Sequence, residues 1–186
     1  MGRIVVTEFI SLDGVIEAPG GGEGFKYDGW TFEFDRGGDG NRFKLDELQK
    51  AEAQLLGRRT YEGFAAAWPD RTDEYGFAER MNTMPKYVVS TKLATADWEN
   101  STILRNLDEV AKAREQVGGD MLVAGSAQLV QGLIDKDLVD ELRLMTFPVV
   151  LGRGKRLWGE TSDKKRFTLA GAKTVGEGVA ILTLRR

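Results

Sequence analysis

The chain of 186 residues contains neither cysteine nor histidine. Without cysteine it forms no disulfide, presents no thiolate nucleophile and builds no cysteine-ligated metal site. Without histidine it lacks the commonest general base, the Ser-His-Asp triad and the commonest transition-metal ligand, and we predict no metal site. Acid–base chemistry is therefore left to carboxylates, lysine, tyrosine or water.

The chain also lacks a long apolar run and a strong excess of one charge. Its first residues lead into a strand-like segment that Glu8 interrupts, which favours neither a signal peptide nor a membrane span. The net charge is only −3, so nothing global indicates a nucleic-acid or membrane partner. We expect a cytoplasmic protein with a single domain over residues 1–186.

Apolar patterning predicts strands and helices in alternation, followed by a strand-rich tail. We expect strands at residues 3–10, 53–56, 86–90, 102–104, 121–124 and 139–150, the last bending at Pro148. We expect helices at residues 42–53, 61–67, 106–117 and from Ser126 to about 134, with 69–84 irregular. Residues 166–174 and 178–186 read as a hairpin. The order predicts an α/β domain with a mostly parallel sheet and an antiparallel edge hairpin.

Gly57-Arg58-Arg59-Thr60 lies where a strand passes into a helix. A helix N-terminus offers free backbone N–H groups and a favourable dipole to an anion, and arginine recognises phosphate in a bidentate manner. The motif therefore indicates a phosphate site. On its own it is more typical of a solvated arginine pair on a surface turn.

Two other strand ends carry similar chemistry, namely Ser90-Thr91-Lys92 and Gly125-Ser126-Ala127-Gln128. In open α/β sheets, ligands bind beyond the carboxyl ends of the strands. If the three strands are parallel neighbours, their ends form one groove suited to a dinucleotide with an additional 2′-phosphate. The chain has neither a G-x-G-x-x-G fingerprint after its first strand nor a Walker A motif, so a standard Rossmann or P-loop site is not supported.

Several segments together resemble the dihydrofolate-reductase-like superfamily. They are Ser11-Leu12-Asp13-Gly14, residues 55–62, residues 86–91, residues 123–129, residues 138–144 and residues 148–157. They follow the superfamily's order and span nearly the whole chain. Within the superfamily, the chain is most similar to the C-terminal reductase domain of the bifunctional riboflavin-biosynthesis deaminase/reductase.

The resemblance implies a three-layer fold with a central mixed sheet of about eight strands and helices on both faces. It implies NADPH as the hydride donor. By position, it assigns the 2′-phosphate to Gly57, Arg58, Arg59, Thr60, Ser90, Thr91 and Lys92, the pyrophosphate to Gly125, Ser126, Ala127 and Gln128, and the nicotinamide to Ile16. It further implies a stand-alone reductase that forms a homodimer through its late strands.

The chain departs from the superfamily at the substrate side. Riboflavin reductases usually carry Glu-Gly-Gly where this chain has Ala124-Gly125-Ser126. Folate reductases carry a carboxylate on the first helix, and counting back from Gly57 reaches Asn41, with Asp39 and Asp46 nearby. The sequence therefore leaves the substrate open.

Four residues are candidates for the substrate side: Asp13, Trp30, Phe34 and Asp39. Asp13 is a candidate catalytic residue that orients the substrate or relays a proton through water, or else an Asp-Gly turn former. Trp30 and Phe34 stack on a flat heterocycle or anchor the long loop 18–40 by packing. On the strand that begins near residue 139, Glu141 and Arg143 suggest a cross-strand or dimer-interface pair.

The sequence thus favours an NADPH-dependent reductase that moves a hydride to a C=N or C=O bond of a small heterocyclic metabolite. The leading hypothesis is a reductase of the riboflavin-biosynthesis type, acting on 5-amino-6-(5-phosphoribosylamino)uracil or a similar compound. The alternatives are a pterin reductase of the dihydrofolate reductase type and a nucleotide-binding module of the same fold without turnover.

Overall fold

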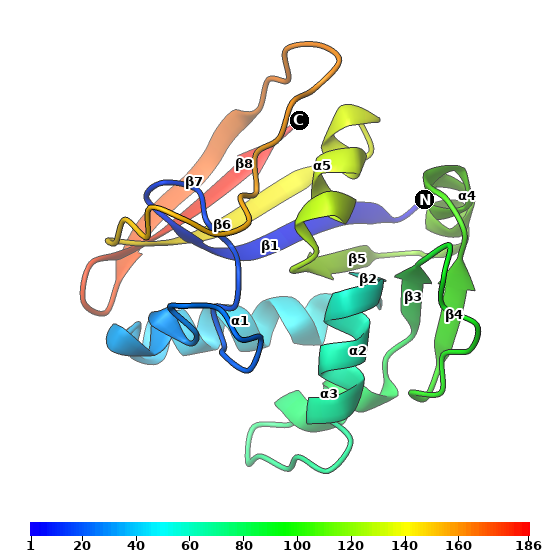
Figure 1. Cartoon of the computed structure of the whole chain (residues 1–186), viewed down its shortest axis with the longest axis horizontal. Coiled ribbons are helices and arrows are strands. Elements are labelled where there is room, and N and C mark those ends of the chain that lie inside the picture. The colour runs from blue at the N-terminus through cyan, green and yellow to red at the C-terminus, as the bar shows by residue number, and fades with distance from the viewer.

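The computed structural model describes all 186 residues and contains one sheet of eight strands (Figure 1). The strands are β1 (Arg3–Ser11), β2 (Ala53–Gly57), β3 (Lys86–Val89), β4 (Ser101–Leu104), β5 (Asp120–Ala124), β6 (Glu141–Phe147), β7 (Thr168–Val175) and β8 (Val179–Arg185). The helices are α1 (Gly37–Lys50), α2 (Arg58–Ala67), α3 (Phe77–Thr83), α4 (Leu107–Gln116) and α5 (Ala127–Asp135), with a 3-10 turn, η1 (Trp30–Glu33).

The strand order in the sheet is β4-β3-β2-β5-β1-β6-β8-β7. The six strands from β4 to β6 are parallel, and the hairpin of β7 and β8 adds to β6 in antiparallel orientation. The predicted fold class is thereby confirmed, including the antiparallel edge hairpin.

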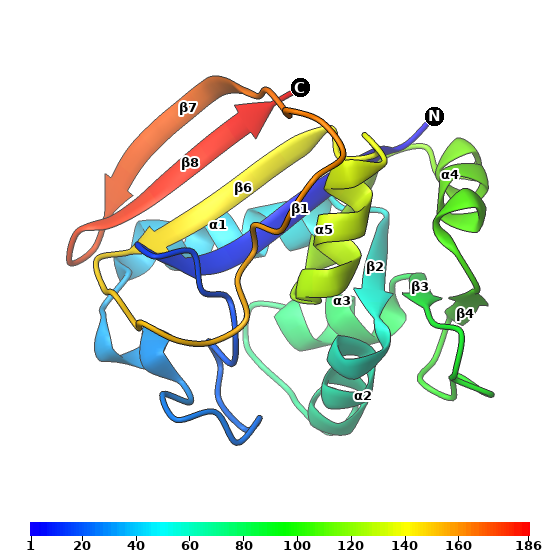
Figure 2. The ribbon, with the colours of Figure 1, turned by 45° about the horizontal axis from the view of Figure 1, so that its top comes forward.

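Helices cover both faces of the sheet, as Figures 1 and 2 show for α1 on one side and α5 on the other. One core cluster joins the sheet to α4 and α5 through residues such as Val110, Val130 and Leu133. A second cluster joins it to α1, α2 and α3 through Leu48, Tyr61 and Met81. The loops at the carboxyl ends of the parallel strands are thereby fixed on two sides. No helix combines the length and apolar character that crossing a membrane requires.

Several expected boundaries were wrong, including the start of α2, which is Arg58 and not residue 61. Residues 69–84 are not wholly irregular, because Phe77–Thr83 forms α3 and the Asp73 carboxylate accepts the backbone N–H groups of Phe77 and Ala78 at 3.0 and 2.6 Å. Helix α1 begins at Gly37, five residues earlier than its apolar pattern suggests. Strand β6 ends at Phe147 instead of bending at Pro148, because proline has no N–H for the ladder.

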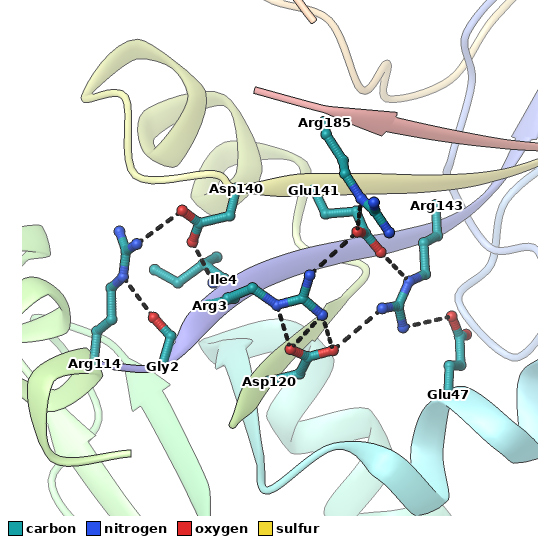
Figure 3. Close-up of polar contacts among 10 residues, drawn as sticks. All are labelled: Gly2, Arg3, Ile4, Glu47, Arg114, Asp120, Asp140, Glu141, Arg143 and Arg185. Carbon is teal, nitrogen blue, oxygen red and sulfur yellow. Dashed lines mark hydrogen bonds and ion pairs between the residues drawn. The ribbon is translucent and has the colours of Figure 1, made fainter. Parts of the chain in front are cut away.

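A network of charged side chains crosses the amino-terminal half of the sheet (Figure 3). Its members come from five elements: Arg3, Glu47, Asp120, Glu141, Arg143 and Arg185. Glu141 is 2% exposed and receives Arg143 Nε at 2.6 Å and Arg185 Nε at 2.8 Å, so its pKa lies below the usual value despite burial. Glu141 and Arg143 thus pair with each other along β6 within one chain. The residue opposite Glu141 on the neighbouring strand β8 is Arg185.

Candidate functional site

The carboxyl ends of β2 and β5 form the point where the strand connections diverge. β2 leads outward through α2 and α3 to β3, whereas β5 leads through α5 in the opposite direction to β6. The two strands share only two residue pairs, Ala53↔Met121 and Gln54↔Leu122, and have no ladder beyond them. Open α/β sheets bind ligands at such a switch point. This crevice is therefore the candidate site.

Side-chain hydroxyls bridge the crevice. Ser126 Oγ accepts the backbone N–H of Gly57 at 2.9 Å and lies 2.7 Å from Thr60 Oγ1. Gly125 and Ser126 both adopt left-handed backbone, with φ of 69° and 68°. A Cβ at Gly125 would lie 3.0 Å from Thr60 Oγ1, so only glycine lets the chain pass this close. Two of the three predicted strand ends are thus in direct contact.

Two helices begin at this crevice, as Figure 2 shows for α2 and α5. Helix α2 starts at Arg58 immediately after β2, and α5 starts at Ala127 with Gln128 in its first turn. Neither N-terminus is capped by a side-chain hydrogen bond. Their first backbone N–H groups are therefore available to an anion, which the helix dipoles also favour.

The predicted cations lie at or beside these helix starts: Arg58 and Arg59 open α2, and Lys92 follows β3, the neighbour of β2. Arg58 is paired with Glu62 at 2.9 Å. Arg59 and Lys92 are exposed, and their side chains have no ion-pair partner. Because Gly57 pairs with Val89, the segment Ser90–Lys92 follows β3 next to the arginine turn. All three predicted strand ends therefore meet at one edge.

The loop after β3 owes its shape to Ser90 and to a residue that the sequence did not reveal. Buried Ser90 accepts the N–H groups of Lys92 and Leu93 through its Oγ, at 3.1 and 2.9 Å. Arg105 Nη1 donates to the carbonyl oxygens of Ser90 and Leu93 at 2.9 and 2.8 Å. Thr91 is exposed at the tip. Arg105 follows β4, and its place directly after a neighbouring strand was the available signal.

Asp13 anchors the loop that follows β6. Its carboxylate accepts Ser11 Oγ at 2.7 Å and the backbone N–H groups of Leu151 and Gly152 at 3.1 and 2.8 Å. The Ser11 hydroxyl and the two N–H groups lower the pKa of Asp13 to about 2. These contacts match the turn-forming interpretation, and the proposed catalytic role of Asp13 stays a prediction.

Ile16 lies in a short buried segment after β1. Its backbone N–H donates to the Lys155 carbonyl at 2.9 Å, and its side chain joins the core cluster with Ile10 and Leu157. Ile16 thus lies near the end of β1, and its contact with the nicotinamide stays a prediction.

The aromatic substrate candidates belong to a packed cluster. Trp30 is 1% exposed, donates its indole N–H to the Glu17 carbonyl at 2.9 Å and packs edge-on against Phe147. Phe34 also packs edge-on against Phe147. Their anchoring role is therefore visible. Asp39 is exposed in the first turn of α1, and no contact of its side chain connects it with the crevice.

The helix carboxylate that faces the sheet is Glu47, not one of the candidates Asp39 or Asp46. Glu47 Oε1 accepts Thr7 Oγ1 at 2.7 Å and pairs with Lys44, whose Nζ also donates to Thr7 at 2.8 Å. Lys44 Nζ lies 4.9 Å from the centre of the Phe9 ring. This polar group lies between α1 and β1. The count from Gly57 missed it because Glu47 lies only ten residues before Gly57, nearer than Asn41.

A second carboxyl, that of Glu8, is buried on β1. Glu8 is 3% exposed, and its Oε1 has no hydrogen-bonding partner. Burial raises the pKa of Glu8 to about 8, and Glu47 adds to this rise, whereas the Gly125 N–H and Lys44 oppose it. The sequence registered Glu8 only as an interruption of an apolar strand.

A protein family and individual curated proteins both match this chain over nearly its whole length. The model of the RibD C-terminal domain family matches residues 3–181. Two Bacillus subtilis (strain 168) proteins, uncharacterized YyaP and YwjB, are 30% and 28% identical, covering 95% and 98% of this chain and 91% and 98% of theirs.

Among solved structures, a similar one is the crystal structure of a Shewanella sp. PV-4 protein provisionally named a riboflavin biosynthesis protein. Its TM-score is 0.74 at 19% identity, over 99% of this chain and 98% of that one. This likeness shows the fold.

Proposed function

Because the chain belongs to the RibD C-terminal domain family, we propose that it is an NADPH-dependent reductase of a small heterocyclic metabolite. The family and the structural neighbour support a reductase-like fold of the riboflavin-biosynthesis type. The observation that carries the proposal is the crevice between β2 and β5, where two uncapped helix N-termini, a glycine turn and two unpaired cations meet.

The donor set fits a pyridine dinucleotide phosphate. Gly125 gives the close backbone approach that a pyrophosphate needs, and the first turns of α2 and α5 supply N–H donors. Arg59 and Lys92 would hold the 2′-phosphate, with Arg58 shared between that phosphate and Glu62. Ser90, Thr91 and Arg105 would shape the adjoining loop.

When bound, NADPH supplies a hydride at its nicotinamide ring. The chain's own part is to position that ring beside the substrate, and positioning can provide a large share of a rate enhancement. Thr7, Lys44 and Glu47 offer hydrogen-bond donors and acceptors to the polar edge of a heterocycle, and Phe9 offers an apolar ring beside them. Asp13 would hold the loop after β6 in place at the same edge.

The hydride acceptor in this proposal is a C=N or C=O bond of a compound resembling 5-amino-6-(5-phosphoribosylamino)uracil. Ala124 stands where riboflavin reductases usually carry glutamate, so this polar group from α1 and β1 would have to take part in recognition. The pterin reductase stays the second candidate, because Glu47 is a carboxylate on the first helix that faces the sheet. A homodimer and a cytoplasmic location stay predictions.

Two measurements, made one after the other, test the proposed function. The first is titration with NADPH and with NADH, following protein fluorescence; we expect tight binding of NADPH only. The second is loss of reduced-nicotinamide absorbance with the aminouracil intermediate, dihydrofolate and simple aldehydes. Turnover with one of these supports a reductase, whereas tight NADPH binding without oxidation across the panel supports the non-catalytic module. Equal binding of both cofactors contradicts the 2′-phosphate assignment.

A further inference from the structure

Glu8 occupies a defined place beside the crevice. In the β1 ladders, Thr7 pairs with Ala124 of β5 and Glu8 pairs with Leu144 of β6. Glu8 therefore lies level with Gly125, the residue directly after β5, and the Gly125 N–H faces its carboxyl. Val6 and Ile10, two positions away on β1, pack in the core cluster beneath α5, so Glu8 is on that face of the sheet.

The carboxyl of Glu8 is incompletely satisfied. It is 3% exposed, and Oε1 has no partner in the protein. Leaving a buried polar atom without a hydrogen bond is costly, and such atoms in native proteins need an explanation. Gly125 forms the turn assigned to the pyrophosphate, and Ile16, the residue predicted beside the nicotinamide, packs in the same core cluster as Ile10. The unpartnered oxygen therefore lies on the face of β1 next to both predicted cofactor contacts.

Few charges act on this carboxyl. Helix α1 contributes Lys44 and Glu47, which act in opposite directions. The directly paired residue of β6 is Leu144, while the charged residues of β6, Glu141 and Arg143, belong to the network around Asp120. The turn after β5 brings the Gly125 N–H, and α5 carries a single charged residue, at its distant end. A new charge at the crevice would therefore strongly influence the protonation of Glu8.

We propose that Glu8 senses the charge of the cofactor's nicotinamide ring, keeping its proton beside the neutral reduced ring and releasing it beside the cationic oxidised ring. This inference rests on the proposed function, because it requires a nicotinamide at the crevice. Glu8 would also balance the reaction, since reduction of a C=N or C=O bond consumes one hydride at carbon and one proton at the heteroatom. The hydride comes from the cofactor, and the heteroatom takes its proton from solvent. Glu8, which lies on the face of β1 opposite Thr7, releases its own proton to solvent when the oxidised ring forms, so this step takes up no net proton.

The test is the pH dependence of cofactor affinity. We measure Kd for NADP+ and for NADPH by fluorescence titration between pH 6 and pH 9. The free protein holds the Glu8 proton up to about pH 8. Kd for NADP+ should therefore decrease by close to tenfold per pH unit below that value and level off above it. Kd for NADPH should lack this dependence.

Comparing the two cofactors removes a confounding effect, because both carry the same titrating 2′-phosphate and only the ring differs in charge. The Glu8→Gln variant keeps the side-chain shape and should lose the difference between them. Glu115→Gln, an exposed glutamate on α4, is the matched control and should keep it. Calorimetry at pH 7 in buffers of different ionisation enthalpy should show release of about one proton on NADP+ binding to the wild type and none to Glu8→Gln.

The outcomes separate the two proposals. If neither cofactor binds, the proposed function is wrong. If both bind but the ratio of their Kd values is independent of pH in the wild type, or the dependence persists in Glu8→Gln, Glu8 is not the sensor. A Glu8→Gln variant that folds, binds NADPH normally and shows a pH-independent ratio supports the inference.

Discussion

The protonation of Glu8 has a consequence for stability that needs no ligand. In an unfolded chain this carboxyl titrates near 4.5, whereas burial raises its pKa in the folded protein to about 8. Between these values the folded state binds more protons than the unfolded state. The free energy of unfolding therefore falls as pH rises, by about 1.4 kcal/mol per pH unit. Over the whole interval the loss is about 5 kcal/mol, a large part of the stability of a typical domain.

The Glu8→Gln substitution isolates this effect. Glutamine has no proton to lose, so near pH 5 the variant should resemble the protonated wild type. As pH rises to 8 the variant should become progressively more stable than the wild type, and the difference should stop growing near pH 8. Lys86, whose pKa burial lowers to about 8 against the opposing charge of Glu99, affects stability above that pH and is common to both proteins.

The assay is urea unfolding at pH 5, 6, 7 and 8, followed by the fluorescence of the four tryptophans. Equal slopes against urea would show that the variants unfold over the same surface, so that the midpoints report stability. Glu115→Gln again serves as the control and should follow the wild type. A stability difference between Glu8→Gln and the wild type that stays constant from pH 5 to 8 would refute the assignment of a buried, protonated carboxyl.

Three further predictions concern the crevice and the loop after β6. Arg59→Ala should weaken NADPH binding about 5- to 30-fold, because one exposed charge-assisted hydrogen bond is lost, and should leave the affinity for NADH unchanged. Titration of both cofactors checks this, with Lys112→Ala as the control. Gly125→Ala should cost about 1–2 kcal/mol of stability and at least tenfold in NADPH affinity, because its φ is 69° and its Cβ would meet a threonine hydroxyl. The control Gly63→Ala, in an open position on α2, should instead be neutral or stabilising in thermal unfolding. Asp13→Asn should destabilise the protein by about 1–3 kcal/mol at pH 7. The greater stability of the wild type should vanish as pH falls from about 4 toward 2, where Asp13 becomes protonated. If the variant and the wild type are cleaved equally fast by protease within residues 148–156, the anchoring role of Asp13 is contradicted.

The strand ends were predictable because their signals are local. Gly57, Ser90 and Gly125 each follow an apolar strand, and parallel strands bring their carboxyl ends to one edge. The hairpin of β7 and β8 was also visible from its glycine turn. These features depend on short-range patterns that a single sequence displays.

The residues that were missed depend on packing between distant segments. Glu47 was hidden because its partner Thr7 is 40 residues away in the sequence. Glu8 was hidden because nothing in a β-strand pattern tells whether a glutamate faces solvent or a core. Arg105 acts on a loop after another strand, and only the β3–β4 pairing brings it there.

The short ladder between β2 and β5 divides the sheet into two blocks, β4-β3-β2 and β5-β1-β6-β8-β7. Two residue pairs join the blocks through the backbone, compared with five between β1 and β5 and seven between β1 and β6. At their carboxyl ends the blocks are held together by the hydroxyls of Thr60 and Ser126. The amides of Glu52 and Gly57 donate across this seam, to the Asp120 carbonyl and to Ser126 Oγ. This seam is the place where the sheet opens most easily, so these two amide hydrogens should exchange sooner than those of β1. A molecule that binds across the seam contacts both blocks. Its binding couples their fluctuations, so that the amide hydrogens of the two blocks exchange at similar rates.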